Sequence, residues 1–260
     1  MNSAGRLLEI YTRLLNANSG GNDVALVKRW AQVFELPADS PTVEDDVVTC
    51  LQAMRAELDL LKAKLQARGV AEDLLRPGFT RLRNISSTAY LNSGWNGHRE
   101  EAARPENRIP FMWANWVLQD ENEEDMPSDE LASLRSELDA LDKSLDGTDM
   151  TPYLRDFVQR QIDTIRSALK VYGVRGVKPV EEALQRVVGT ITFEKERVQA
   201  EQEQASEETL GILARTAQCI EKTAKVADNL DKIRKAGEGA YSLAASVAPA
   251  LTMWAQHLLK

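Results

Sequence analysis

The feature that most constrains the fold of this chain is a row of apolar residues that recurs every three or four positions. One such row contains Val47, Leu51, Met54, Leu58, Leu61 and Leu65, and a second contains Leu131, Leu134, Leu138, Leu141 and Leu145. This alternating spacing places the side chains of each row on one face of an α-helix. Both rows, called leucine seams below, are shorter than a free-standing coiled coil requires. We therefore expect them to pack inside a bundle of antiparallel helices, with a coiled-coil dimer as the alternative.

Composition extends this expectation to the rest of the chain. Ala, Leu, Glu, Arg, Lys and Gln are abundant among the 260 residues, and they lose little side-chain freedom in a helix. Helical periodicity is also present over 5–17, 23–36 and 151–173. Residues 180–234 contain no proline, and we expect two long helices that meet near position 205, with one continuous helix as the alternative. The predicted fold class is all-α, with multi-helix bundles, short heptad-like leucine seams and one irregular segment.

Charge is unevenly distributed along the chain, whose net charge is −8. Residues 119–150 contain twelve acidic and two basic residues, whereas residues 76–118 contain six basic and three acidic ones. An acidic run that ends in proline is typical of a solvated connection between domains. We therefore expect an N-terminal helical domain over 1–119, an acidic linker over 120–127 and a C-terminal long-helix bundle over 128–260.

Residues 76–118 interrupt the helical pattern. They contain three prolines, three glycines and six aromatic residues, and a helical period returns only near Ile109. Clusters of proline and glycine are typical of loops. We expect an irregular, mostly loop-like segment that ends in a short aromatic helix over 109–119.

The same segment contains the candidate ligand-binding residues, which are Arg81, Arg83, Tyr90, Trp95, His98 and Arg99. Guanidinium groups bind phosphates and carboxylates through paired hydrogen bonds, and aromatic rings stack on bases. Such a site would bind a nucleotide, a single-stranded nucleic acid or an acidic peptide, and Trp95 would supply the stacking face. In the alternative, which we favour, the rings form a cap over the bundle and the arginines pair with the acidic run at 120–130.

The 21 residues from Gly239 to Leu259 carry no formal charge. Their length matches the roughly 20 residues that cross a bilayer, but Ala, Ser and Thr dominate them and their apolar drive for insertion is weak. Apolar residues recur there at helical spacing as Leu243, Val247, Leu251 and Trp254. We expect these side chains to be buried or to join subunits of an oligomer, with membrane association as the alternative.

Residues that could carry out catalysis are few and scattered. The sequence contains no phosphate-binding glycine loop, no dinucleotide-binding glycine pattern and no nucleophile elbow. Its two histidines are not at metal-ligand spacing, and we expect Cys50 and Cys219 to be buried as small apolar residues. We therefore expect no metal, no cofactor and no enzymatic activity.

These exclusions leave an interaction function as the expectation. The first 21 residues carry charges where a secretory signal has an uncharged apolar run, which together with the two cysteines favours the cytoplasm. We expect a non-catalytic helical component that binds a protein partner or further copies of itself: an adaptor, a regulator, or a component linked to a bacterial toxin or to phage defence. The alternatives are a membrane-acting effector that uses 239–259 and a binder of nucleotides or single-stranded nucleic acid through 76–108. Nucleic acid is the less favoured partner because the chain is acidic overall.

Overall fold

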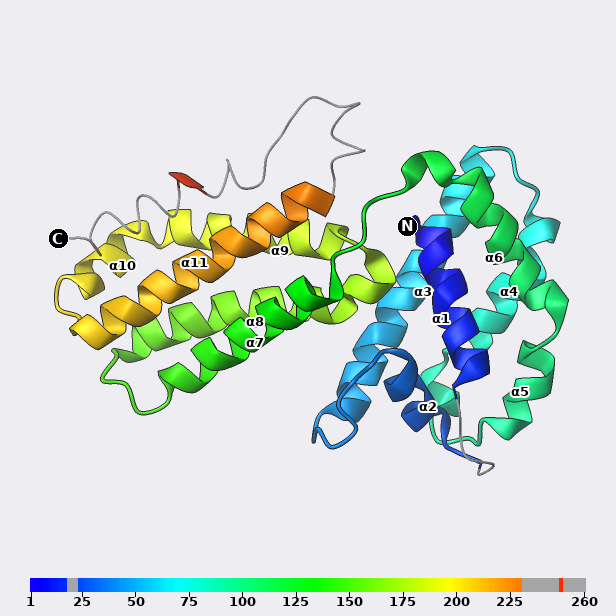
Figure 1. Ribbon diagram of the computed structural model, residues 1–260, viewed down its shortest axis with the longest axis horizontal. Coiled ribbons are helices and arrows are strands. Elements are labelled where there is room, and N and C mark those ends of the chain that lie inside the picture. Colours follow the sequence, from blue (N-terminus) through cyan, green and yellow to red (C-terminus); the bar gives the residue numbers. More distant parts are fainter. Residues whose placement is uncertain (18–22, 231–247, 250–260) are drawn as a thin grey trace. The chain divides into compact units, whose positions relative to one another are not determined.

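The structure is a computed structural model that describes residues 1–17, 23–230 and 248–249. The described residues form eleven α-helices and two short 3₁₀-helices (Figure 1). They form no β-strand beyond an isolated bridge between Ala25 and Gly94. The predicted all-α, multi-helix fold is confirmed. The chain divides into two compact units, which are described separately below.

Unit 1 consists of residues 1–122 together with 173–176. Its helices are α1 (Ser3–Asn16), α2 (Leu26–Val33), α3 (Val43–Ala67), α4 (Glu72–Ile85), η1 (Thr88–Tyr90), α5 (Asn96–Ala102), α6 (Pro105–Val117) and η2 (Gln119–Glu121). α6 packs against α1 and α4, and α3 packs against α1, α2 and α4 (Figure 1). Because all six α-helices contribute apolar side chains to one cluster, unit 1 has a single core.

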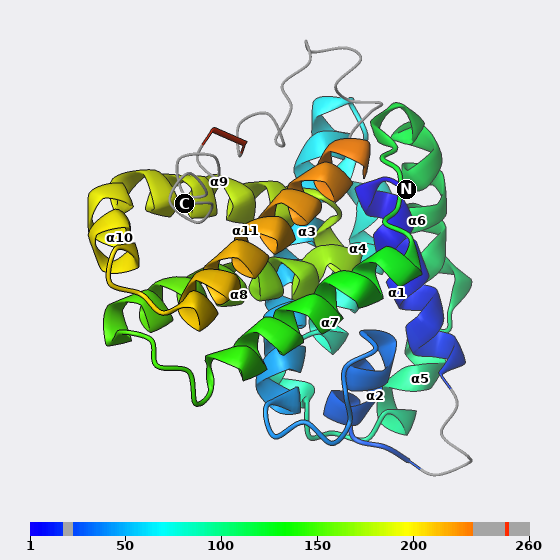
Figure 2. The ribbon, with the colours of Figure 1, turned by 60° about the vertical axis from the view of Figure 1, so that its left-hand side comes forward.

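Unit 2 consists of residues 123–172 and the described residues from 177 onward. Its helices are α7 (Ser128–Leu145), α8 (Pro152–Arg175, of which the last residues belong to unit 1), α9 (Lys178–Phe193), α10 (Lys195–Gln202) and α11 (Glu207–Leu230). α11 packs against α7 and α9, and Figure 2 shows α11 beside α7. Apolar side chains from all five helices form the core of unit 2.

Both leucine seams are buried, as predicted. The seam of α3 is at most 2% exposed from Leu51 to Leu65, and the α7 seam is at most 4% exposed from Leu134 to Leu145. Leu131, at the start of the second seam, is partly buried. Each seam belongs to the core of its own unit, so the expectation that the seams pack inside helical bundles is confirmed.

The chain is broken near residue 205, as predicted, and the alternative of one continuous helix is wrong. α10 ends at Gln202 and α11 begins at Glu207. The hydroxyl of Ser206 accepts a hydrogen bond from the backbone N–H of Thr209 at 3.2 Å, which caps the new helix. A further break at Glu194, between α9 and α10, was not predicted.

Residues 76–118 differ most from the expectation, because α4, α5 and α6 make most of this segment helical. Pro77 and Pro110 lie in the second turns of α4 and α6, where each removes one backbone hydrogen bond. Pro105 occupies the first turn of α6, where its restricted φ suits a helix. The expected loop is therefore wrong, because packing between helices outweighs the helix-breaking tendency of these residues.

Gly78 shows how close that packing is. A Cβ atom at Gly78 would lie 2.4 Å from the carbonyl oxygen of Asn107 and 3.2 Å from the ring of Phe111. The next residue of α4, Phe79, stacks on Phe111 with ring centroids 5.0 Å apart. Glycine at this position therefore permits a close crossing of α4 and α6.

The predicted acidic linker is held at both of its ends. Asp120 and Glu121 lie in η2, and the Arg68 guanidinium donates hydrogen bonds to both carboxylates at 2.7–2.8 Å. Toward the other end, Met126 is 7% exposed and its backbone N–H donates to the Tyr172 hydroxyl at 2.6 Å. The division between the units falls between residues 122 and 123, inside the expected linker. The expected domains over 1–119 and 128–260 stay a prediction.

We predict that truncating either leucine seam destabilises the protein. Leu58 and Leu138 are 2% and 1% exposed. Leu58→Ala and Leu138→Ala should each lower the free energy of unfolding by about 2–5 kcal/mol, because each leaves a cavity. Leu74, which is 60% exposed, is the control, and Leu74→Ala should change stability by less than about 0.5 kcal/mol. Chemical denaturation measures all three, and unchanged unfolding of both seam variants would contradict the bundle.

A second prediction concerns the crossing of α4 and α6. Gly78→Ala should lower the free energy of unfolding by about 1–3 kcal/mol, because the new methyl group meets backbone rather than a flexible side chain. Gly189 in α9 is the matched control, since a Cβ atom there has nothing within 4 Å. Gly189→Ala should stabilise the helix by about 0.5–1 kcal/mol. Opposite signs in thermal unfolding support the close crossing, and equal stabilisation by both substitutions rules it out.

Candidate functional site

Five of the six predicted ligand-binding residues form one connected group, called the α5 cluster below. Its members are Arg81, Tyr90, Trp95, His98 and Arg99. Arg81 of α4 forms an ion pair with Glu101 at 2.7 Å and donates a hydrogen bond to the backbone carbonyl of His98 at 2.8 Å. The His98 ring lies 5.4 Å from the Tyr90 ring, and its Nε2 is 2.9 Å from the Ser93 hydroxyl. The polar atoms of Arg81 and His98 thus contact neighbouring residues of unit 1.

Trp95 is buried rather than available for stacking. It is 1% exposed, and the Arg29 guanidinium lies over its ring at 5.2 Å from the ring centroid. Arg29, on α2, is itself 1% exposed. A cation over an aromatic face is an attractive contact that gains strength when water is excluded. Trp95 and Arg29 therefore join α2 to the start of α5, as expected of a structural cap.

The remaining candidate, Arg83, lies apart from the α5 cluster. It forms an exposed ion pair with Asp59 of α3. The expected pairing of these arginines with the acidic run at 120–130 is wrong. The partners of Asp120 and Glu121 in that run are Lys64 of α3 and Arg68, which directly follows α3. The arginines and the acidic run are close in sequence, which suggested that they pair. In the folded unit, the C-terminal end of α3 places Lys64 and Arg68 beside the acidic run instead.

Burial affects the ionisable groups in and around the α5 cluster. The pKa of His98 is lowered, first by burial and then by the positive charge of Arg81. The Tyr11 hydroxyl donates a hydrogen bond to the backbone carbonyl of Ala102 at 2.8 Å, and burial raises its pKa to about 12. The pKa of Arg29 is lowered by burial and, to a smaller extent, by Arg99. His98 and Tyr11 are therefore uncharged at neutral pH, which is consistent with a structural network.

Tyr11 and Arg29 were not among the predicted site residues. Each lies in an N-terminal helix, far in sequence from the segment that it contacts. Arginine is usually exposed, and nothing in the neighbouring sequence indicates that an arginine in a short amphipathic helix is buried. Their contacts become visible only in the folded chain.

Neither cysteine is placed for nucleophilic chemistry. Cys50 is fully buried and Cys219 is 3% exposed. Burial, with a contribution from Glu137, raises the pKa of the Cys219 thiol to about 11. The reactive thiolate form of Cys219 is therefore scarce at neutral pH. Within the described ranges, no group of three or more His, Cys, Asp or Glu side chains is arranged to hold a metal ion.

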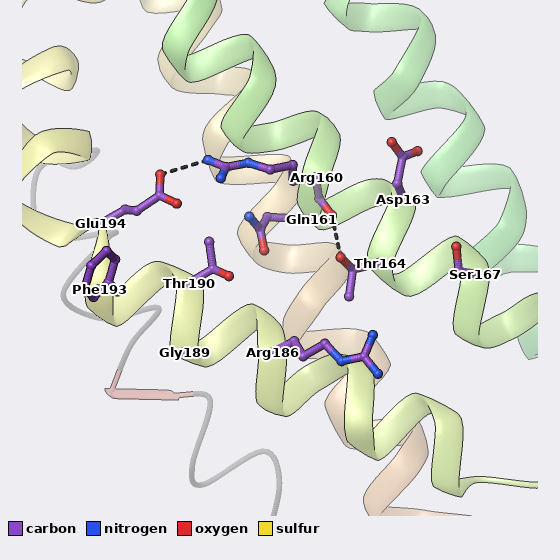
Figure 3. Close-up of a pocket in the computed structure, with 10 residues that line it drawn as sticks. All are labelled: Arg160, Gln161, Asp163, Thr164, Ser167, Arg186, Gly189, Thr190, Phe193 and Glu194. Atoms are coloured by element: carbon purple, nitrogen blue, oxygen red, sulfur yellow. Dashed lines mark hydrogen bonds and ion pairs between the residues drawn. The ribbon is translucent and has the colours of Figure 1, made fainter.

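A shallow groove of about 730 Å³ runs between α8 and α9 of unit 2 (Figure 3). It is lined by Arg160, Gln161, Asp163, Thr164, Ser167, Arg186, Gly189, Thr190, Phe193 and Glu194. Glu194, at one end, accepts hydrogen bonds from Arg160 at 2.8 Å and from Tyr153 at 2.6 Å. The Thr164 hydroxyl donates within its own helix. The groove is open to solvent, and Phe193, which is 92% exposed, is its one large exposed apolar side chain.

α6 presents a different kind of surface, called the α6 stripe below, which consists of Ile109, Met112 and Trp116. These side chains are 52%, 49% and 69% exposed. Their spacing of three and then four residues places them on one face of the helix. On the opposite face Phe111 is fully buried and its ring packs near Tyr11, with centroids 6.0 Å apart. α6 is therefore anchored on its inner face and apolar on its outer face.

The sequence indicated an aromatic helix here but did not distinguish the two faces. Apolar residues occur all round α6, so periodicity alone does not show which side is buried. The contacts of Gly78 and Phe79 with Phe111 determine the orientation of the helix.

The candidate oligomer or membrane residues Leu243, Val247, Leu251 and Trp254 lie outside the described residues. Of the helices within the described ranges, none combines the length and the apolarity that a bilayer-spanning segment requires.

Two tryptophans in different environments give a matched test of the cap. Trp95→Ala should lower the free energy of unfolding by about 3–5 kcal/mol, because it removes a buried ring and leaves Arg29 without its aromatic contact. Trp116→Ala, at a 69% exposed position, should leave the melting temperature almost unchanged. Differential scanning calorimetry measures both. Equal, small effects would mean that Trp95 is not part of the core.

Known proteins provide no match to this chain, whether the comparison is made with family models, with curated proteins or with solved structures. Function is therefore inferred from the chain's own surfaces. In the α5 cluster Arg81 and His98 are hydrogen-bonded and Trp95 is buried, and the groove of unit 2 is shallow with one exposed ring. The α6 stripe alone among these three places several large apolar side chains in solvent at helical spacing.

Proposed function

We propose that the protein is a non-catalytic helical component that binds other protein chains, and that the α6 stripe is its docking surface. One observation carries this proposal: Ile109, Met112 and Trp116 are about half exposed or more at positions i, i+3 and i+7 of one helix. Helices that dock into grooves or against other helices present their apolar anchors at this spacing. The narrower role expected from the sequence, a component linked to a bacterial toxin or to phage defence, stays a prediction.

The chemistry of the α6 stripe suits a protein partner. Fully burying an exposed methionine or isoleucine side chain contributes about 1.5–3 kcal/mol, of which the half-exposed Ile109 and Met112 can each gain about half. Tryptophan is enriched among the residues that dominate binding energy. Met112 is flexible and polarisable, so it adapts to an irregular partner surface. Trp116 offers a large area with few rotatable bonds.

The support for the stripe is rigid, which favours binding. α6 packs against both α1 and α4, and its inner face contributes Phe111 and Ala114 to the core of unit 1. Little binding free energy is therefore lost to ordering this helix when a partner docks. The stripe is available without a change in the fold of unit 1.

The geometry gives less support to the alternatives. A nucleotide or nucleic-acid site over 76–108 would use Trp95 and Arg81, but Trp95 is covered by Arg29 and Arg81 is paired with Glu101. The membrane alternative depends on 239–259, nearly all of which lies outside the described residues. We therefore place the docking surface on α6.

Photo-crosslinking tests the docking surface in cells that naturally produce the protein. A photoreactive amino acid at Met112 should crosslink the full-length chain to a protein, and Trp116→Asp in the same chain should suppress that product. Gln185, an exposed position of α9, is the control site and should not give the same product. If Met112 yields no protein adduct, or an adduct that Trp116→Asp leaves unchanged, the stripe is not a docking surface.

A further inference from the structure

A row of residues at every fourth sequence position extends over α6, from its N-cap residue Arg104 to Asp120 in η2. Its members, in order, are Arg104, Arg108, Met112, Trp116 and Asp120. All five are exposed. Residues four apart are neighbours on a helix surface, so the central three form a continuous ridge. The order along the row is cation, cation, thioether, indole and anion.

When two copies of the row are placed side by side in opposite directions, the groups of one copy complement those of the other. Positions at equal distances before and after Met112 carry groups that attract each other: Arg108 matches Trp116, and Arg104 matches Asp120. From this we propose that the α6 stripe binds a second copy of this chain, with the two α6 helices antiparallel about a two-fold axis at Met112. The proposal rests on the proposed function and specifies the partner.

A two-fold axis makes each contact occur twice. The guanidinium of Arg108 in each copy faces the Trp116 ring of the other copy, and the two Met112 side chains meet at the axis. Such isologous contact is the most common arrangement in soluble dimers. A cation over an indole face is attracted by the ring electrons, and the attraction strengthens when water is excluded. A parallel arrangement would place Arg108 against Arg108, where like charges repel.

The groups at the centre of the proposed interface are available in the single chain. Neither Arg104 nor Arg108 makes an ion pair with any residue in the described ranges. Trp116 is 69% exposed. Asp120 keeps 63% of its side chain exposed beside Arg68, whose hydrogen bond lowers the pKa of its carboxyl and keeps it charged.

Helix packing concentrates the contact at the centre of the row. Two packed α-helices commonly cross at about 50°, so they diverge away from the crossing point. Arg108, Met112, Trp116 and the adjacent Ile109 therefore carry the interface, while Arg104 and Asp120 lie at its edge. An interface of this size is small, so the dimer is weak and depends on concentration and on salt.

A pair of variants tests the antiparallel geometry directly. Arg108→Glu places a carboxylate against the second copy's Trp116, and Trp116→Arg places a cation against the second copy's Arg108. Each variant alone should weaken self-association at least about tenfold, because the two-fold axis repeats the lost contact. An equimolar mixture should restore it. In the mixed dimer the introduced carboxylate of one copy faces the introduced guanidinium of the other, while the unchanged Arg108 and Trp116 face each other on the other side of the axis.

Sedimentation velocity of the full-length protein over a wide concentration range measures these associations. Arg186→Glu is the control, since Arg186 is an exposed cation of α9 that makes no ion pair with any described residue, and it should leave self-association unchanged. Circular dichroism melts of each variant show that it is folded, which is expected for substitutions at exposed positions.

The proposal is supported by a wild-type dimer that both single variants weaken and their mixture restores. It is overturned by a dimer that neither variant weakens, or by single losses that the mixture does not repair. A wild-type protein that stays monomeric at every concentration also overturns it. In that last case, crosslinks from Met112 to a different protein would leave the docking surface intact, whereas the absence of any crosslink would remove both proposals.

Discussion

The close crossing of α4 and α6 is the contact on which the arrangement of unit 1 depends. Gly78 leaves room for the backbone of Asn107, and Phe79 stacks on Phe111 directly beside that point. Phe111 in turn packs near Tyr11 of α1, so one ring on α6 is shared by two neighbouring helices. Because these contacts orient α6, they also decide that the α6 stripe faces solvent. The surface proposed to bind is thus a consequence of how the opposite face is packed.

The arginines of unit 1 fall into two groups with different surroundings. Arg29 and Arg81 make contacts within the unit: Arg29 lies over the Trp95 ring, and Arg81 contacts Glu101 and the His98 backbone. Buried charges of this kind are retained only with partners, because an unpaired one is costly to desolvate. Arg104 and Arg108 remain at the surface without ion pairs among the described residues. This division gives structural roles to the first group and leaves the second group available for recognition.

Unit 2 contributes a regular bundle whose surface is mainly polar. Its groove between α8 and α9 is bordered by charges that neutralise one another, such as Arg160 with Glu194. Arg166 similarly contacts three carboxylates, of Asp139, Asp142 and Asp163. Surface ion pairs of this type contribute little stability, and Arg186, which also lines the groove, makes no ion pair with a described residue. The exposed apolar row that we propose as a docking surface lies in unit 1.

The sequence by itself determined the elements that depend on periodicity. The leucine seams of α3 and α7, the break near 205 and the all-α class follow from apolar spacing and from Ser206, because a helix repeats every 3.6 residues whatever it packs against. Burial and the choice of contact partners depend instead on residues far away in the chain, and only the tertiary structure decided them.

Trp95 and Trp116 occur in the same aromatic, arginine-containing segment, yet Trp95 lies under Arg29 and Trp116 lies in solvent. Pro77 and Pro110 indicated loops, and the packing of α4 on α6 made both positions helical. Local sequence specifies the period of an element, but the face that is buried is set by the helix that packs against it.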